Sequence, residues 1–286
     1  MKPKLKIAIQ KSGRLNEDSI QILKECDIEL SHGLNKLRSD AHNFPLEVLF
    51  LRDDDIPQYV ADGVADAGIV GENVIVETNK KLKIVEKLGF GKCRLSIAVS
   101  KNNKYNSIKD LEGKKIATSY PTILSKYLKT KKVKAKIEIV SGSVEIAPSV
   151  GLADAICDLV SSGSTLFANG LKETEVIFRS EAALVSGMNL NKEKSAILHK
   201  LLFRIRAVKK SRHNKYVLLN APNNKLDAIC KILLGIKSPT IIPLAEKGWS
   251  SVHSVIDEER FWEIIELLKE NGAQGILVIP IEKMIV

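Results

Sequence analysis

The chain has 286 residues, of which 44% are hydrophobic and 27% charged, and its net charge is +10. This length predicts two or three domains, and the composition excludes an intrinsically disordered protein. The N-terminus is basic without a continuous apolar segment, and no stretch approaches the length of a membrane span. We therefore expect a cytoplasmic protein with no membrane contact. The four cysteines are too scattered for a metal knuckle, and we expect free thiols.

The positive charge is unevenly distributed. Residues 211–286 contain nine Lys and Arg and nine Asp and Glu, so the excess of 35 basic over 25 acidic residues lies within 1–210. A basic region of this kind favours polyanionic partners, either nucleic acid or small polyphosphates. The densest run, Lys126–Lys136, has six lysines but no zinc-finger or RNA-binding signature. We interpret it as a solvated helix end and expect no nucleic acid partner.

The first predicted strand, Leu5–Ile9, ends in a basic loop. This loop, Gln10–Leu15, contains a glycine and precedes a helix, which we expect Asn16 to cap. Open α/β sheets bind ligands beyond the carboxyl ends of their strands. Lys11 and Arg14 are therefore candidates for contact with an anion.

Three consecutive acids follow the second predicted strand, Leu46–Leu51. Arg52 and the acids Asp53–Asp55 lead into a helix that extends through Val60. Carboxylates at a helix start interact favourably with the helix dipole, and Mg²⁺ also accepts one or two of them together with phosphate oxygens. Both interpretations stay open, and we assign no metal ligand.

Two segments of the chain repeat one pattern. Asp62–Gly71 and Val150–Asp158 each combine a helix end, a glycine and an Ala-Asp-Ala tripeptide that enters an apolar strand. The repeat indicates two α/β lobes built on one supersecondary plan. Between them, Gly89–Ala98 contains two glycines, and we expect it to cross from one lobe to the other and to bring Lys92 and Arg94 near the cleft.

A polar loop follows the apolar strand Ala155–Val160. The strand carries Asp158 near its end, and Ser161–Thr165 consists of small hydroxyl residues around Gly163. Loop amides and the start of the next helix favour an anion, and a glycine permits a turn that a side chain would obstruct. An acid before such a loop can accept hydrogen bonds from sugar hydroxyls, so the segment suits a ribose 5-phosphate. A polar turn with a purely structural role is the alternative.

The remainder of the chain predicts a separate domain. We expect strands at 175–178 and 182–185, a helix at 192–209 and, after residue 211, the order strand, helix, strand, strand, helix, strand. This βαββαβ order is that of a ferredoxin-like fold. On the fold alone, the domain serves either assembly or regulation.

Several of these motifs resemble those of the ATP phosphoribosyltransferase family. The resemblance lies in QKSGRL at 10–15, RDDDIP at 52–57, GKCR at 91–94 and Glu145–Leu166, which is similar to the family's phosphoribosyl-diphosphate motif. Ser162 departs from the family, which often has Thr there, but the hydroxyl is kept.

The resemblance implies a fold and an activity. The fold is α/β, with a two-lobed core of the periplasmic-binding-protein kind and a C-terminal ferredoxin-like, ACT-like domain. The domains would be 1–94 with 180–210, then 95–179, then 211–286. The reaction would join N1 of ATP to ribose C1 of phosphoribosyl diphosphate and release pyrophosphate, as the first step of histidine biosynthesis. We expect Mg²⁺ on the pyrophosphate, and no nucleophile, since positioning and charge stabilisation suffice.

The resemblance also implies a set of substrate-binding residues. The loop would hold the 5-phosphate, the acids would accept hydrogen bonds from the ribose hydroxyls, and the cations would neutralise polyphosphate charge. These residues are Lys11, Arg14, Asp55, Lys92, Arg94, Glu145, Asp154, Asp158, Ser161, Ser162, Gly163, Ser164, Thr165 and Leu166.

The C-terminal domain has its own resemblance. Ser238-Pro239-Thr240 and the PIEKM segment at 280–284 are similar to the regulatory domain of the family's long form. This similarity implies feedback inhibition by histidine, with Ser238 and Thr240 as candidate contacts, and a homo-oligomer between a dimer and a hexamer.

Two other classes of protein fit part of the sequence. Phosphoribosyltransferases of purine salvage usually place two adjacent acids before the phosphate loop, whereas Asp154 and Asp158 are four residues apart. A non-catalytic sensor on a binding-protein fold would not need the basic loops or the phosphate loop.

Overall fold

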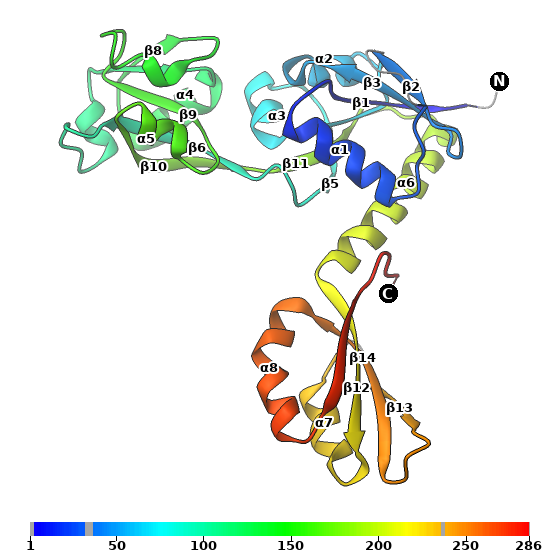
Figure 1. Ribbon diagram of the computed structural model, residues 1–286. Coiled ribbons are helices and arrows are strands. Elements are labelled where there is room, and N and C mark those ends of the chain that lie inside the picture. The colour runs from blue at the N-terminus through cyan, green and yellow to red at the C-terminus, as the bar shows by residue number, and fades with distance from the viewer. Residues whose placement is uncertain (1–2, 32–36, 236–237, 286) are drawn as a thin grey trace. The chain divides into compact units, whose positions relative to one another are not determined.

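The computed structural model describes residues 3–31, 37–235 and 238–285. The chain forms two compact units: residues 1–24 with 28–199 make up the first, and residues 25–27 with 200–286 the second (Figure 1). The first unit contains a six-stranded and a five-stranded sheet, and the second contains a four-stranded sheet. Within the described ranges, we find no helix with the length and apolar character needed to cross a membrane.

The six-stranded sheet has parallel strands at its centre. Its order is β2 (Arg38–Asp40), β3 (Leu46–Leu51), β1 (Leu5–Gln10), β4 (Ala67–Gly71), β11 (Ala182–Ser186) and β5 (Lys83–Lys87). β1 is parallel to β3 and β4, whereas β11 is antiparallel to β4 and β5. The strands β1, β3 and β4 lead into α1 (Arg14–Glu25), the one-turn η1 (Asp53–Asp55) with α2 (Ile56–Ala61), and α3 (Glu72–Thr78).

The chain enters the five-stranded sheet after residue 92 and leaves it after residue 180 (Figure 1, green). The order is β10 (Leu171–Ser180), β6 (Cys93–Ser100), β9 (Ala155–Val160), β7 (Lys115–Thr118) and β8 (Lys136–Ile139). β7 is parallel to β8 and β9, whereas β6 is antiparallel to β9 and β10. The other elements are η2 (Ile108–Leu111), α4 (Pro121–Lys131) after β7, η3 (Val144–Ile146), and α5 (Ser164–Ala168) after β9.

The two Ala-Asp-Ala segments have the same backbone role in both sheets. Asp66, before β4, accepts a hydrogen bond from Lys6 N at 2.8 Å, and its own N–H donates to Lys6 O at 2.8 Å. Asp154, before β9, makes the matching pair with Lys115, at 2.9 Å in each direction. Each carboxylate therefore fixes the register between its own strand and a parallel neighbour, which explains why the pattern occurs twice.

The second unit has the ferredoxin-like topology expected from the sequence. After α6 (Lys192–Arg212) come β12 (Asn214–Pro222), η4 (Asn223–Lys225), α7 (Leu226–Ile232), β13 (Thr240–Pro243), β14 (Trp249–Asp257), α8 (Glu258–Glu270) and β15 (Gln274–Pro280). The sheet order is β13-β14-β12-β15, and all neighbours are antiparallel. α7 and α8 cover one face, where Ile229, Phe261 and Leu268 share a core with Val217 and Val252.

The structure differs from the sequence predictions at the first helix and at several other elements. β6 begins within Gly89–Ala98, which was predicted only as a crossing between lobes, and α3 was not predicted. α1 begins at Arg14, and Asn16 lies in its first turn, where the side-chain amide donates to Gln10 O at 2.5 Å. The prediction that Asn16 caps the helix is therefore wrong. β2 and β5 were not predicted, because short segments with charged ends such as Arg38–Asp40 and Lys83–Lys87 lack a clear apolar alternation.

We predict that the two register carboxylates differ in their contribution to stability. The Asp66 side chain is 8% exposed and binds Lys194 Nζ at 2.9 Å, whereas Asp154 is 44% exposed and its cation, Lys114 Nζ, lies 3.8 Å away. Asp66→Ala should lower the free energy of unfolding by about 3 kcal/mol, because the half-buried ammonium of Lys194 and the Lys6 N–H both lose their partner. Asp154→Ala should lower it by about 1 kcal/mol or less. Urea titration and hydrogen exchange of β1 and β7 measure both; equal losses would contradict the expected difference.

Candidate active site

The loop after β9 carries most of the predicted substrate-binding residues. Gly163 has a φ of +85° and is the N-cap of α5, and its carbonyl accepts a hydrogen bond from Phe167 N at 3.1 Å. The hydroxyls of Ser162 and Ser164 lie 3.0 Å apart, and Ser164 N donates to Ser162 Oγ at 3.4 Å. Because glycine adopts this φ without the strain that a side chain brings, Gly163 allows the loop to turn tightly into the helix.

A cavity of about 320 Å³ joins this loop to two acids and a cation. Its lining consists of Arg14, Glu145 and residues 158–166. Arg14 is the first residue of α1, beyond the carboxyl end of β1, whereas the loop lies beyond the carboxyl end of β9. The cavity therefore combines loop amides and hydroxyls, a guanidinium group and two carboxylates, which suits a ligand with an anionic group and several hydroxyls.

One carboxylate of this cavity, Asp158, has a raised pKa. Asp158 is half-buried, and burial is the main cause that raises the pKa of its carboxyl, with the charge of Glu145 adding to the effect. A hydrogen bond from Leu159 N, 2.8 Å from Asp158 Oδ1, acts in the opposite direction. Such a crowded carboxylate pair is stabilised by hydroxyl donors or a cation placed between its members.

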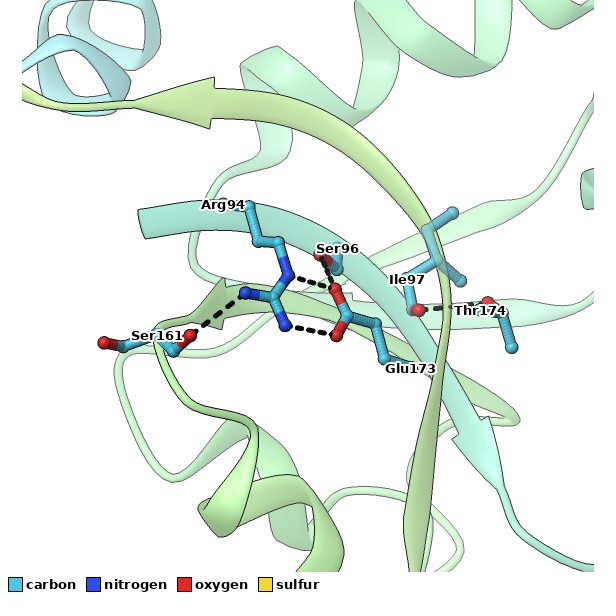
Figure 2. A network of polar contacts seen from close by, with 6 residues as sticks. All are labelled: Arg94, Ser96, Ile97, Ser161, Glu173 and Thr174. Atoms are coloured by element: carbon cyan, nitrogen blue, oxygen red, sulfur yellow. Dashed lines mark hydrogen bonds and ion pairs between the residues drawn. The ribbon is translucent and has the colours of Figure 1, made fainter. Parts of the chain in front are cut away.

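A polar network holds the loop to the neighbouring strands (Figure 2). Arg94 on β6 donates to Glu173 on β10 through Nε (2.5 Å to Oε1) and Nη2 (2.6 Å to Oε2). Its remaining nitrogen, Nη1, donates to the carbonyl of Ser161 at 3.0 Å, and Ser96 Oγ donates to Glu173 Oε1 at 2.7 Å. The hydrogen bonds from Arg94 are the main cause that lowers the pKa of Glu173.

A second cavity, of about 400 Å³, lies beyond the ends of other parallel strands. Its polar lining includes Asp53 and Asp54 after β3, Ser119 and Tyr120 after β7, and Glu77 on α3. Burial and the charges of its two neighbouring acids raise the pKa of Asp54. Burial first, and then the charges of Asp158, Asp53 and Asp54, raises the pKa of Tyr120, so this ring lies within electrostatic reach of both cavities.

Glu77 also connects the parts of the first unit that carry the two sheets. Its carboxylate accepts hydrogen bonds from Thr122 N at 2.8 Å and Ile123 N at 3.1 Å, at the start of α4. A carboxylate at this position satisfies amides that the helix itself leaves unpaired and interacts favourably with the helix dipole. Glu77 thus lines the cavity while its oxygens are engaged by the backbone.

The structure brings together only part of the predicted set. Arg14, Glu145, Asp158 and the loop 161–166 share the first cavity. Within the described ranges, five predicted residues line neither cavity: Lys11, Asp55, Lys92, Arg94 and Asp154. Lys11, Asp55 and Lys92 are exposed, and Arg94 is engaged by Glu173. Asp154 precedes β9, about 13 Å along the strand from Asp158 at the usual rise per residue.

The sequence predictions missed the second cavity and Glu173. Asp53 and Asp54 belong to the same acidic run as Asp55, which was the predicted substrate contact. The backbone turn of η1 decides which of the three acids lines the cavity, and the sequence motif does not show this. Tyr120 lies two residues after β7, beyond a strand's carboxyl end, where open α/β sheets bind ligands. Glu173 gave no such signal, because its contact with Arg94 joins residues far apart in the sequence.

Comparisons with known proteins agree on one family. A family model described as "ATP phosphoribosyltransferase" matches residues 52–207, and one described as "HisG, C-terminal domain" matches 211–283. The chain is 63% identical to an ATP phosphoribosyltransferase of Cytophaga hutchinsonii, over 98% of each chain. It is 57% identical to one of Bacteroides fragilis, over 99% of this chain and 100% of that protein.

Solved structures give the same result for the core. An ATP phosphoribosyl transferase (HisG:HisZ) complex from Thermotoga maritima matches with a TM-score of 0.60 and 28% identity, over 71% of this chain and 98% of that one. A histidine kinase sensor domain with similarity to periplasmic binding proteins matches with a TM-score of 0.50 and 9% identity, over 73% and 91%. The latter likeness concerns the fold alone, and it confirms the predicted kind of core.

These similarities extend over the whole chain and include the loop 161–166 after β9. They exclude the salvage and sensor alternatives for the chain as a whole. The enzymes of this class are pentosyltransferases of histidine biosynthesis whose substrates are ATP and phosphoribosyl diphosphate. The chain belongs to the ATP phosphoribosyltransferase family.

Proposed function

We propose that the cavity at the end of β9 binds phosphoribosyl diphosphate, with the loop 161–166 on the 5-phosphate. The observation that carries this proposal is the cavity itself, in which Arg14, Glu145 and Asp158 meet the loop. Loop amides, hydroxyls and the turn at Gly163 suit a phosphate group. Asp158 and Glu145 suit the ribose hydroxyls, which would relieve the crowding of their carboxylates.

The reaction in this cavity needs orientation more than chemical participation by the protein. The bond from ribose C1 to the pyrophosphate oxygen breaks, the electron pair leaves with pyrophosphate, and N1 of the adenine forms the new bond to C1. The ribose carbon is cationic as pyrophosphate departs, so the carboxylates of Asp158 and Glu145 stabilise it electrostatically. Holding both substrates in line supplies much of the remaining rate enhancement.

We assign ATP to the second cavity, beside the first. Tyr120 supplies an aromatic surface there, and the carboxylates of Asp53 and Asp54 can accept hydrogen bonds from an amino group. The exposed cations Lys11 and Lys92 belong to the loops before α1 and β6 and are available to polyphosphate oxygens. The predicted contacts of Asp55, Asp154 and Arg94 with substrate have no support in either cavity lining.

Mg²⁺ is the divalent metal that we propose for this site. In the described part of the chain, no group of three or more His, Cys, Asp and Glu residues is arranged to hold a metal ion. Mg²⁺ does not need such a group, because it binds through one or two carboxylates together with phosphate oxygens. We assign no protein ligand to the metal, which would neutralise charge on the departing pyrophosphate.

We propose three domains with the boundaries given by the sequence motifs: 1–94 with 180–210, 95–179, and 211–286. The six-stranded and five-stranded sheets support the first two, and the C-terminal family model supports the third. The compact units divide instead within α6, between residues 199 and 200. Helix α6 thus contributes to both units.

We propose that the C-terminal domain binds histidine as a feedback inhibitor in a cytoplasmic homo-oligomer of two to six chains. Ser238 and Thr240 are exposed, and Thr240 pairs in register with His253 on the next strand. On the face opposite α7 and α8, His253 interacts with Tyr216 Oη at 2.7 Å and Ser251 Oγ at 3.0 Å. Exposed apolar residues on the edge strands, including Ile242 and Leu277, support association between copies.

We predict that Gly163→Val weakens binding of phosphoribosyl diphosphate by about tenfold or more, because a branched side chain disfavours the positive φ and obstructs the phosphate. A Cβ at Gly163 would meet only Val160 Cγ1, at 3.9 Å, so the fold has room for it. Gly113→Val is the matched control, since Gly113 has a φ of +73° and lies outside both cavities. Titration in Mg²⁺ buffer measures the affinity, and an unchanged value in folded Gly163→Val would remove the loop from the site.

We also predict that histidine inhibits the full-length protein when phosphoribosyl diphosphate is well above its half-saturation level. A ligand in the second unit inhibits only by favouring a less active arrangement, so excess substrate should not abolish the effect. Initial rates of phosphoribosyl-ATP formation with and without histidine test this. A chain ending at residue 210 should lose the inhibition, whereas purely competitive inhibition of the full chain would rule out a regulatory site in the C-terminal domain.

A further inference from the structure

We propose that Glu173 is a positioning residue for the loop 161–166 and acts through Arg94. This inference rests on the proposed binding of the 5-phosphate by that loop. Glu173 lies in none of the motifs that indicated the site, and neither it nor Arg94 lines the cavity among the described residues. Its influence on the loop follows from the network in Figure 2, in which one guanidinium group joins three segments of the chain.

Glu173 fixes the orientation of the Arg94 side chain. Nε and Nη2 of Arg94 bind both carboxylate oxygens of Glu173, which fixes the plane of the guanidinium group. A bidentate pair of this kind holds its direction far better than a single ammonium contact would. The third donor, Nη1, is thereby held 3.0 Å from the Ser161 carbonyl.

Arg94 in turn orients the loop backbone. The peptide bond between Ser161 and Ser162 is planar and trans, so its carbonyl and its N–H point in opposite directions. Holding the carbonyl toward Arg94 therefore holds the Ser162 N–H on the other side of the chain. Because loop amides are the donors expected to bind the phosphate, the orientation of this peptide determines whether one of them is available.

A bulge in β10 places Glu173 and Glu175 on opposite faces of the sheet. Residues two apart on a strand normally point to the same face. On β10, Glu173 pairs with Ala98 and Glu175 with Ile97, so Thr174 is an extra residue and the strand has a bulge. Glu173, opposite Ala98, therefore lies on the face of Ser96 and Arg94, and Glu175 lies on the opposite face. Thr174 Oγ1 stabilises it by donating to Ile97 O at 3.0 Å (Figure 2).

The bulge also provides a matched control within two residues. Glu175 accepts hydrogen bonds from the hydroxyls of Tyr105, at 3.0 Å, and Tyr127, on the face of the sheet away from Arg94. It resembles Glu173 in charge, strand and partial burial. A change at Glu175 therefore disturbs the same strand without changing the orientation of the Arg94 guanidinium.

The experiment measures the affinity of the folded full-length protein for phosphoribosyl diphosphate and the KM for ATP. Glu173→Gln should weaken binding of phosphoribosyl diphosphate by about tenfold, since small misplacements of a binding group have effects of this size or larger. The KM for ATP should change less than about twofold, and Glu175→Gln should leave both values within about twofold while lowering the melting temperature. Glu173→Asp serves if Glu173→Gln does not fold.

Two further measurements distinguish positioning of the loop from a general loss of stability. Arg94→Lys alone and the double variant Arg94→Lys with Glu173→Gln should each weaken binding about tenfold. Both substitutions break the same contact between Glu173, Arg94 and the Ser161 carbonyl, so their effects on the binding free energy do not add. Hydrogen exchange of the segment 161–166 should accelerate in Glu173→Gln but not in Glu175→Gln.

Three results would overturn the proposal. Unchanged affinity in the Glu173 variants would show that the loop does not need the network. Tighter binding would show that Glu173 instead withholds Arg94 from the phosphates. Equal losses for both substrates would indicate a general structural effect. Gly163→Val shows whether the loop itself binds the phosphate. If Gly163→Val weakens binding and the Glu173 variants do not, the loop assignment stands and only the role of Glu173 is wrong. If Gly163→Val has no effect, the loop assignment is wrong.

Discussion

Parallel pairing at the centre of both sheets determines where every part of the site lies. β1, β3 and β4 run in one direction in the first sheet, and β7, β8 and β9 run in one direction in the second. Their carboxyl ends lead into the residues that line the two cavities. Backbone N–H groups at the starts of the following helices also lie at these ends, which gives them an affinity for anions before any side chain is considered. The register carboxylates Asp66 and Asp154 act at the other ends of β4 and β9 and maintain this parallel order.

The sequence predicted the features that depend on neighbouring residues. The loop around Gly163, the acid before it and the βαββαβ order of the second unit are all local patterns, and the structure contains each of them. Asp154 shows the limit of the same reasoning. A motif placed it with Asp158, but Asp154 lies just before β9 and Asp158 near its end, about 13 Å apart at the usual rise per residue, which exceeds the width of a ribose.

Features that depend on contacts between distant segments were not predictable. Glu173 and Glu175 point to opposite faces of the sheet because Thr174 adds a residue to β10 between them, and the composition of that strand carries no sign of a bulge. Arg94 was expected to neutralise phosphate charge, since a lone arginine in a basic motif has no visible partner in the sequence. Its carboxylate partner lies 79 residues further along the chain. Because Arg94 pairs with this carboxylate and donates to the Ser161 carbonyl, it contacts the loop backbone instead of lining the cavity.

Five carboxylates of the described residues line the two cavities, although the proposed substrates are both polyanions. Asp158 and Glu145 line one cavity, and Asp53, Asp54 and Glu77 line the other. Burial first, and then the charge of neighbouring acids, raises the pKa of Asp158 and Asp54. Such acids would repel bare phosphates, so their placement makes sense only if they address other parts of the ligands: sugar hydroxyls, an amino group, the cationic ribose carbon or a bound metal. Attraction for the phosphates must then come from backbone amides, Arg14 and the basic surface of residues 1–210. Because Glu173 already neutralises Arg94, the loop amides carry a larger share of that attraction, and their orientation matters correspondingly more.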